Sequence, residues 1–204
     1  VYLDFEMTED DLYERLVDFG YSEADDLSRL HYYLLPDLPP LDSELGGLRL
    51  ERIALRHGAA LVVIDTTSRV IAGAENEADT FRALYNHTGT RLKRHGVTVL
   101  RLDHTGKDPT QGQRGSSAKA DDVDVVWRLT ADGEAVKLRA THQRVPWVDG
   151  DLAIVRKLDP LRHEPARGTL YSPKAKEAAA VLDRLGAPAD IGGTAAYRFL
   201  REHG

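Results

Sequence analysis

Three short apolar runs in this sequence each lead to a side chain that can handle a proton or a metal ion. Glu6 follows the run LDF, Asp65 follows LVVI, and His104 follows VTVLRLD. A carboxylate at such a position can accept a proton from water or hold a Mg²⁺ ion through a bound water, and an imidazole can donate to a phosphate. Taken alone, each residue is also compatible with an ordinary polar group at the end of a surface strand.

The elements that must position these side chains are buried strands. Residues 1–5, 61–64 and 97–102 are apolar runs typical of strands covered on both faces, and 31–35 predicts another strand. Helical patterns lie between them at 8–20, 48–56 and 77–95. This alternation predicts an α/β fold with a mostly parallel sheet. Because ligands of such sheets bind at the carboxyl ends of the strands, we expect Glu6, Asp65 and His104 at one edge.

The second half of the chain changes pattern. Residues 123–129, 135–140 and 152–158 predict strands, which we expect to form antiparallel edge strands of the same sheet. The predicted core therefore covers 1–158. Residues 159–172 predict a linker, and 173–204 predict two helices, as a helical hairpin or a partial winged helix-turn-helix.

Basic residues gather in and after the third site-bearing strand. Lys107, Arg114 and Lys119 lie in a segment rich in Gly, Ser and Gln, which is typical of loops that follow a nucleic-acid backbone and equally of solvated loops. Arg144 stands just beyond a predicted strand. It is placed either to reach the nucleotide of a neighbouring subunit or to serve as a surface charge.

Composition limits the class of protein. The 204 residues have 42% apolar and 29% charged side chains, a net charge of −6 and no cysteine. Disulfides and thiolate metal ligands are excluded, and a strongly basic nucleic-acid module is disfavoured, although a local basic patch stays compatible. No run approaches the ~18 apolar residues of a membrane span. We expect a cytoplasmic protein with no membrane partner.

The order of these motifs resembles the RecA superfamily of P-loop ATPases over about residues 1–158. It is most similar to the RepA-like replicative helicase branch, the "AAA family ATPase" proteins of bacterial plasmids and phages. The segments LDFEMT, LVVIDTTSR and RLDHTGKD resemble the Glu-bearing strand, the Walker B strand and the phosphate-sensing motif of that family. RGSSAKADDVD resembles the segment that faces DNA, and THQR resembles the Lys-x-Arg finger motif with His142 in place of Lys.

This resemblance implies a RecA-like three-layer core that hydrolyses ATP with Mg²⁺ as a ring homo-oligomer, expected to be a hexamer, on single-stranded DNA. It implies that Glu6 activates the attacking water, that His104 senses the γ-phosphate and that Arg144 reaches in from the next subunit. The other implied roles are nucleotide binding by Asp65 and Thr66, with Asp65 holding Mg²⁺ through water, and DNA binding by Lys107, Arg114 and Lys119.

The chain departs from the family pattern by containing no GxxxxGK[ST] motif. We expect this phosphate-gripping segment upstream of Val1 in a longer ATPase, and we expect the chain alone to bind nucleotide poorly and one face of its sheet to be exposed. Two alternatives remain open. One is a recombinase-like or regulatory switch ATPase, and the other is a non-catalytic module for DNA binding or assembly.

Overall fold

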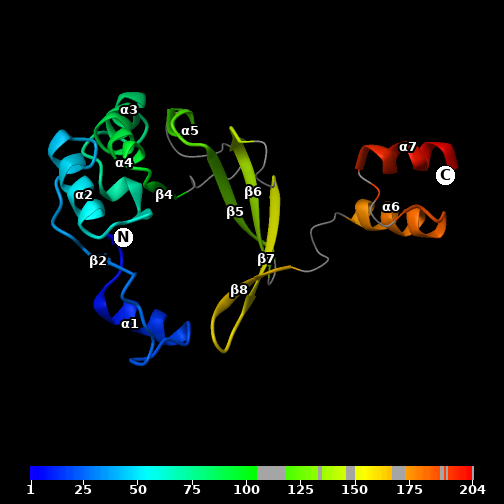
Figure 1. Ribbon diagram of the computed structural model, residues 1–204, viewed down its shortest axis with the longest axis horizontal. Helices are drawn as coiled ribbons and strands as arrows, with labels where there is room; N and C mark the ends of the chain where they lie inside the picture. The colour runs from blue at the N-terminus through cyan, green and yellow to red at the C-terminus, as the bar shows by residue number, and fades with distance from the viewer. Residues whose placement is uncertain are drawn as a thin grey trace. The chain divides into compact units, whose positions relative to one another are not determined.

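The computed structural model describes residues 1–104, 118–132, 135–145, 150–166, 173–188, 191 and 193–203 (Figure 1). The chain divides into two compact units. The first consists of 1–126, 142–145 and 158–162, and the second consists of 127–141, 146–157 and 163–204. The domain boundaries expected near residues 158 and 172 stay predictions.

The first unit contains a parallel sheet of four strands in the order β2-β1-β3-β4. The strands are β1 (Tyr2–Asp4), β2 (Tyr32–Leu34), β3 (Leu61–Asp65) and β4 (Thr98–Leu102). Asp4 pairs with Asp65 and Asp65 with Leu102, so the strands end level with one another. The predicted parallel α/β sheet is confirmed, and its carboxyl ends form one edge.

The helices of the first unit fill the connections between these strands. They are α1 (Glu9–Asp18), α2 (Glu44–Arg56), the 3₁₀ turn η1 (Thr67–Arg69), α3 (Ala78–Leu84), the π-helical turn η2 (Tyr85–Gly89), α4 (Thr90–Arg94) and α5 (Ala118–Asp121). The predicted start of α1 is confirmed as a capping box: Asp11 N–H donates to Thr8 Oγ1 at 3.2 Å, and Thr8 N–H donates to Asp11 Oδ2 at 3.0 Å.

Helix α2 begins earlier than the predicted position 48, because the Ser43 side chain caps it by accepting from Gly46 N–H at 3.1 Å. The two glycines that follow let the backbone approach its neighbours closely. A Cβ at Gly46 would lie 2.1 Å from Pro40 O, and one at Gly47 would lie 1.9 Å from His87 O. His87 belongs to η2, so the helix predicted over 77–95 is interrupted where α2 packs against it.

The core of the first unit lies where α2, α3 and α4 pack together and against the sheet (Figure 1). Strand β3 is covered on both faces, since Val62, Val63 and Ile64 are all buried. Strand β4 differs, because Leu100 and Leu102 on one of its faces are 47% and 36% exposed. Among the described residues, the apolar side chains with 0% exposure are Leu3, Leu41, Leu50, Val62 and Phe81.

The later strands form a second sheet in the order β5-β6-β7-β8, with β6 antiparallel to β7. They are β5 (Val125–Asp132), β6 (Ala135–Gln143), β7 (Asp151–Lys157) and β8 (Arg162–Pro165). The expectation that they extend the parallel sheet as edge strands is wrong within the described residues. Consecutive strands with short connections pair with one another more readily than with a distant strand. Strand β8 also lies inside the segment predicted to be a linker.

The C-terminal residues form α6 (Pro173–Arg184) and α7 (Gly193–His203), and these two helices contact each other. Two helices are what the sequence predicts for this region. Whether they belong to a winged helix stays a prediction. Within the described ranges, no helix has the length and apolar character needed to cross a membrane.

Candidate functional site

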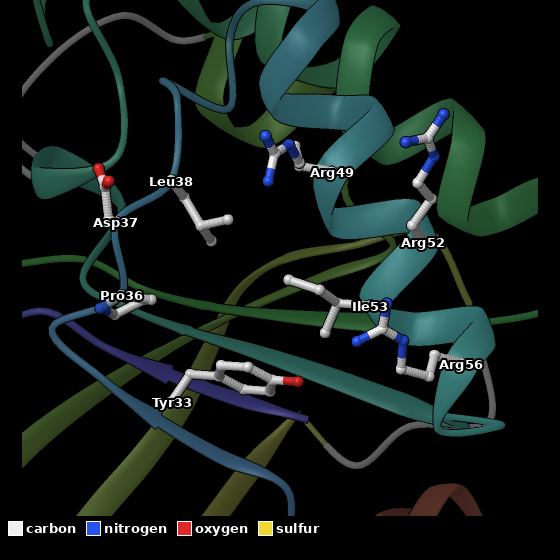
Figure 2. A pocket seen from close by; sticks show the side chains of 8 residues that line it. All are labelled: Tyr33, Pro36, Asp37, Leu38, Arg49, Arg52, Ile53 and Arg56. Atoms are coloured by element: carbon white, nitrogen blue, oxygen red, sulfur yellow. The ribbon is translucent and has the colours of Figure 1, made fainter.

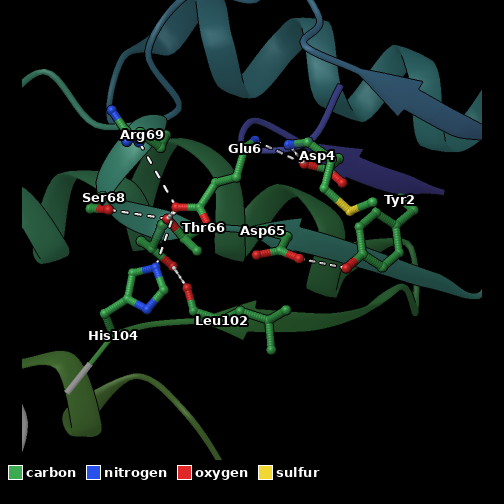
Figure 3. Close-up of polar contacts among 11 residues, drawn as sticks. Tyr2, Asp4, Glu6, Asp65, Thr66, Ser68, Arg69, Leu102 and His104 are labelled. Atoms are coloured by element: carbon green, nitrogen blue, oxygen red, sulfur yellow. Dashed lines mark hydrogen bonds and ion pairs between the residues drawn. The ribbon is translucent and has the colours of Figure 1, made fainter. Parts of the chain in front are cut away.

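The turn that follows β1 is held by a buried carboxylate. Asp4 is fully buried, and its Oδ1 accepts from the backbone N–H groups of Glu6 at 2.8 Å and Met7 at 3.0 Å. Its Oδ2 accepts a short hydrogen bond from the hydroxyl of Tyr32 on the neighbouring strand β2. These bonds fix the backbone of Glu6 at the carboxyl edge of the sheet (Figure 3).

A second tyrosine holds the carboxylate of β3. Tyr2 donates its hydroxyl to Asp65 Oδ2 at 2.6 Å, and its ring stacks on that of Tyr32 with centroids 4.9 Å apart and planes 6° apart. Each of two strand-end carboxylates is therefore oriented by one member of a stacked tyrosine pair. We refer to Tyr2, Asp4, Tyr32 and Asp65 as the tyrosine–aspartate network.

The ionisation states in this network follow from burial and hydrogen bonding. Burial pushes the pKa of Asp4 up, but the hydrogen bonds from Tyr32 and from Glu6 and Met7 N–H outweigh it, and the pKa lies below its ordinary value. Burial first, and then the bonded carboxylate, raise the pKa of Tyr2 and of Tyr32. Both hydroxyls therefore stay protonated and donate hydrogen bonds to the two carboxylates.

Beside this network lies a group of four side chains from three strand ends, which we call the strand-end cluster. Glu6 Oε1 lies 3.3 Å from Thr66 Oγ1, 3.3 Å from His104 Nε2 and 3.9 Å from Arg69 Nε. Figure 3 shows Glu6 in the middle of these three side chains. All three contacts fall on Oε1, so within the described part of the chain Oε2 is left without a partner.

The structure thus brings Glu6, Thr66 and His104 together, as the parallel sheet predicts. Asp65 lies at the same edge with its carboxylate turned to Tyr2, and its Oδ1 accepts no hydrogen bond from a described residue. One free carboxylate oxygen beside a threonine hydroxyl fits a Mg²⁺ ion held through water, which needs few protein ligands. Among the described residues there is no group of three or more His, Cys, Asp or Glu side chains that could hold a metal ion.

The other predicted site residues are not part of the strand-end cluster. Arg144 is exposed; its backbone N–H donates to Asp124 O at 2.8 Å. Burial raises the pKa of Asp122, while the positive charges of Arg101 and Arg144 oppose that rise. Lys107 and Arg114 lie outside the described residues, as does the side chain of Lys119.

Sequence reasoning missed Arg69 and the two tyrosines. Arg69 is the last residue of η1, the turn that directly follows β3 and Thr66, and this places its guanidinium 3.9 Å from Glu6 Oε1. The signal for the network was polar alternation in a buried strand, since Tyr2 and Asp4 are two residues apart and face the same side.

The comparisons with known proteins agree with this geometry. A family model described as "AAA domain" matches residues 1–110, which contain all four strands of the parallel sheet and the whole strand-end cluster. No curated protein matches the chain. The family match indicates an ATPase-type function with a general dependence on nucleotide and Mg²⁺. Since the matched region is more than half of its length, the chain belongs to the AAA domain family.

Proposed function

We propose that this chain is the hydrolytic part of a RecA-type ATPase of the RepA-like branch, which moves on single-stranded DNA as a ring, expected to be a hexamer. The observation that carries the proposal is the convergence of Glu6, Thr66 and His104 at the carboxyl edge of a parallel sheet, beside Asp65. Open α/β sheets bind their ligands at this edge. Phosphoryl transfer requires a general base, a metal-binding carboxylate and a group that donates a hydrogen bond to the phosphate.

In this proposal Glu6 accepts the proton of the water that attacks the γ-phosphate. Its Oε1 is occupied by Thr66, His104 and Arg69, which fix the orientation of the carboxylate. Its Oε2 is the oxygen left for the water, and the side chain is 33% exposed, so solvent can reach it. A base held this way needs no rearrangement before it acts.

Asp65 and Thr66 would hold the nucleotide's Mg²⁺ ion, with Asp65 acting through a bound water, and the ion would offset negative charge on the phosphates. His104 reports on the γ-phosphate. Its Nε2 contacts Glu6 at 3.3 Å, and it stands directly before residues 105–117, so a change at the phosphate can reach that segment through the backbone. Lys107, Arg114 and Lys119 are proposed to contact the DNA backbone.

Arg144 is proposed to stabilise the transition state at the nucleotide of the neighbouring subunit. An arginine that acts on another subunit must be exposed and must not be locked in a close ion pair of its own. Arg144 is exposed, and its guanidinium has no ion pair within 4.0 Å among the described residues. These properties support the proposal.

The test is steady-state ATP hydrolysis with and without single-stranded DNA. It uses two forms, the 204-residue chain and the longest protein that its gene encodes, because the chain itself contains no GxxxxGK[ST]. Glu6→Gln and Arg144→Ala are assayed separately and as a mixture. We expect DNA-stimulated hydrolysis that each substitution abolishes and that mixing partly restores, since some interfaces then combine an intact Glu6 with an intact Arg144.

Each other outcome points to a different function. Hydrolysis that DNA does not stimulate and that Arg144→Ala does not abolish would indicate a switch ATPase that controls assembly. An absence of hydrolysis in both forms would favour a non-catalytic binding module. Loss of activity in both variants without recovery on mixing would remove the trans role of Arg144.

A further inference from the structure

A groove of 460 Å³ lies between α2 and the connection that leads from β2 to α2 (Figure 2). None of its lining residues belongs to the strand-end cluster or is used in the proposed ATPase mechanism. Its volume falls within the range of about 300–1,000 Å³ that is usual for small-molecule sites. The lining residues are Tyr33, Pro36, Asp37, Leu38, Arg49, Arg52, Ile53 and Arg56.

One wall of the groove carries three arginines of α2. Arg49, Arg52 and Arg56 are spaced three and four residues apart, so they share one face of the helix over about 10 Å. All three are exposed, and none forms an ion pair with a described residue. In Figure 2, Arg49 and Arg56 extend from α2 toward the opposite side of the groove, while Arg52 runs along the helix.

The acidic residues of α2 do not compensate this charge. Glu51 binds Arg91 at 3.4 Å and His95 at 2.9 Å, and Glu44 lies 3.6 Å from Arg91. Both carboxylates are therefore engaged with α4. The arginine wall is a local excess of positive charge in a chain whose net charge is −6. Such an excess favours an anionic ligand.

The opposite wall is mostly apolar and contains one aromatic ring. Tyr33 is half-buried, and its hydroxyl is bonded to His57 Nε2 at 2.7 Å, which holds the ring in place beside Pro36 and Leu38. Ile53 of α2 completes the apolar surface. A ligand that uses both walls must combine negative charge with a flat or apolar part.

The charge around Tyr33 reinforces the arginine wall. His57 stacks on His31 with ring centroids 3.8 Å apart. Burial lowers the pKa of His57, and the nearby His31 and Arg56 lower it further. These neighbouring groups oppose the addition of a positive charge to His57. The same positive surroundings attract an anion.

We propose that this groove binds a nucleotide, either free or within a single strand, with its phosphate on Arg49 and Arg56 and its base against Tyr33. Guanidinium groups match phosphate oxygens in pairs, and bases stack on aromatic rings whatever their sequence. Among the described residues that line the groove, Asp37 is the one carboxylate. It repels phosphate from its own end of the groove and can accept a hydrogen bond from a sugar hydroxyl there.

The test measures binding to the 204-residue chain by fluorescence anisotropy and by calorimetry. The probes are a fluorescein-labelled oligothymidylate, thymidine monophosphate and inorganic phosphate. The test variant is Arg49→Ala with Arg56→Ala, and the matched control is Lys93→Ala with Arg94→Ala, which removes the same charge from exposed positions of α4. Thermal melting followed by circular dichroism confirms that both variants fold.

The proposal predicts roughly tenfold or greater weakening of nucleotide binding in the groove variant and little change in the control. For the oligonucleotide, the slope of log affinity against log salt should fall by about 0.7, because one phosphate contact is lost. Tyr33→Phe should keep binding, and Tyr33→Leu should weaken thymidine monophosphate but not inorganic phosphate. Tighter binding of the oligonucleotide assigns a strand, and equal binding assigns a free nucleotide.

Three results would overturn the proposal. Binding of either nucleotide probe that is the same in the groove variant and the unaltered chain would place the ligand elsewhere. An absence of binding by both nucleotide probes would leave the groove without this ligand. If the arginine substitutions changed only the self-association of the chain, seen as a molar mass that depends on concentration, the groove would bind an acidic surface of a second copy. The failure of the ATPase proposal would be recognised separately, because Glu6→Gln leaves every groove residue intact.

Discussion

The tyrosine–aspartate network decides which carboxylates at the sheet edge are available for chemistry. Asp4 has both of its oxygens engaged by Glu6, Met7 and Tyr32, so it has a structural role. Asp65 gives one oxygen to Tyr2 and keeps the other. The sequence identifies Asp65, because it ends an apolar run, but it does not single out Asp4, which lies inside one. It does not identify their partners, since Tyr32 lies 28 residues from Asp4 and Tyr2 lies 63 from Asp65.

Removing one hydroxyl from this network should shift the acid stability of the protein. The folded-state pKa of Asp4 is lowered, so its contribution to stability is full above its unfolded value of 3.8 and is lost as pH falls through the lower folded value. Tyr32→Phe removes a donor to Asp4 and raises that folded pKa. We expect a loss of about 1–3 kcal/mol at neutral pH and acid unfolding that begins at higher pH, measured by urea titration at several pH values.

Tyr13→Phe is the matched control, because Tyr13 is 71% exposed and lies on α1. Its free energy of unfolding should stay within about 0.5 kcal/mol of the unaltered chain at every pH. If the two variants behaved alike, the hydrogen bond between Tyr32 and Asp4 would not stabilise the fold.

At the scale of elements, the sequence predicts what depends on neighbours along the chain. The capping box of Thr8 and Asp11 and the buried strand β3 are both local patterns, and both are confirmed. The turn η2 was not predicted, because it depends on contact between distant segments, whereas the start of α2 was missed although its Ser43 cap is local. Thr88 of η2 donates to Leu41 O at 2.6 Å, and Gly47 leaves room for His87 O.

Gly47→Ala should therefore destabilise the protein, although alanine usually stabilises a helix relative to glycine by roughly 0.5–1 kcal/mol. An added Cβ would lie 1.9 Å from His87 O, so α2 and η2 would have to separate. We expect a loss of about 1–3 kcal/mol or more in the free energy of unfolding, measured by chemical denaturation. Leu45→Ala, at a 57% exposed position of the same turn, is the control and should change little. A stabilised Gly47→Ala protein would contradict the close packing of these two elements.

For the whole molecule, the sequence predicts the parallel sheet but not the division of the strands between two sheets. Residues 1–104 alternate strand and helix, which is enough to predict the four parallel strands. The later strands were expected at the edge of that sheet but form a separate sheet of their own. Which strands pair with which leaves no signal in the local sequence. Leu100 and Leu102 of β4 are accessible, but β3 is covered on both faces, so the exposure of one face of the sheet stays a prediction.

This difference between strands gives a prediction about core packing. Ile64→Ala on β3 removes a side chain that is 1% exposed and should cost about 2–5 kcal/mol of stability. Leu100→Ser on β4 changes a side chain that is 47% exposed and should cost far less, on the order of 0.5 kcal/mol. Chemical denaturation of the 204-residue chain measures both values. Equal losses would show that the exposed face of β4 is covered in solution.

The central claim is that the strand-end cluster hydrolyses ATP with Glu6 as the base, and one variant tests it most directly. Glu6→Gln keeps the size of the side chain and its ability to accept from Thr66 but cannot take a proton from water. In whichever form hydrolyses ATP, we expect turnover to fall about 10²–10⁴-fold while ATP binding is retained. Glu14→Gln, on the exposed side of α1, should leave turnover unchanged. Turnover by Glu6→Gln within a few-fold of the unaltered protein would contradict the account.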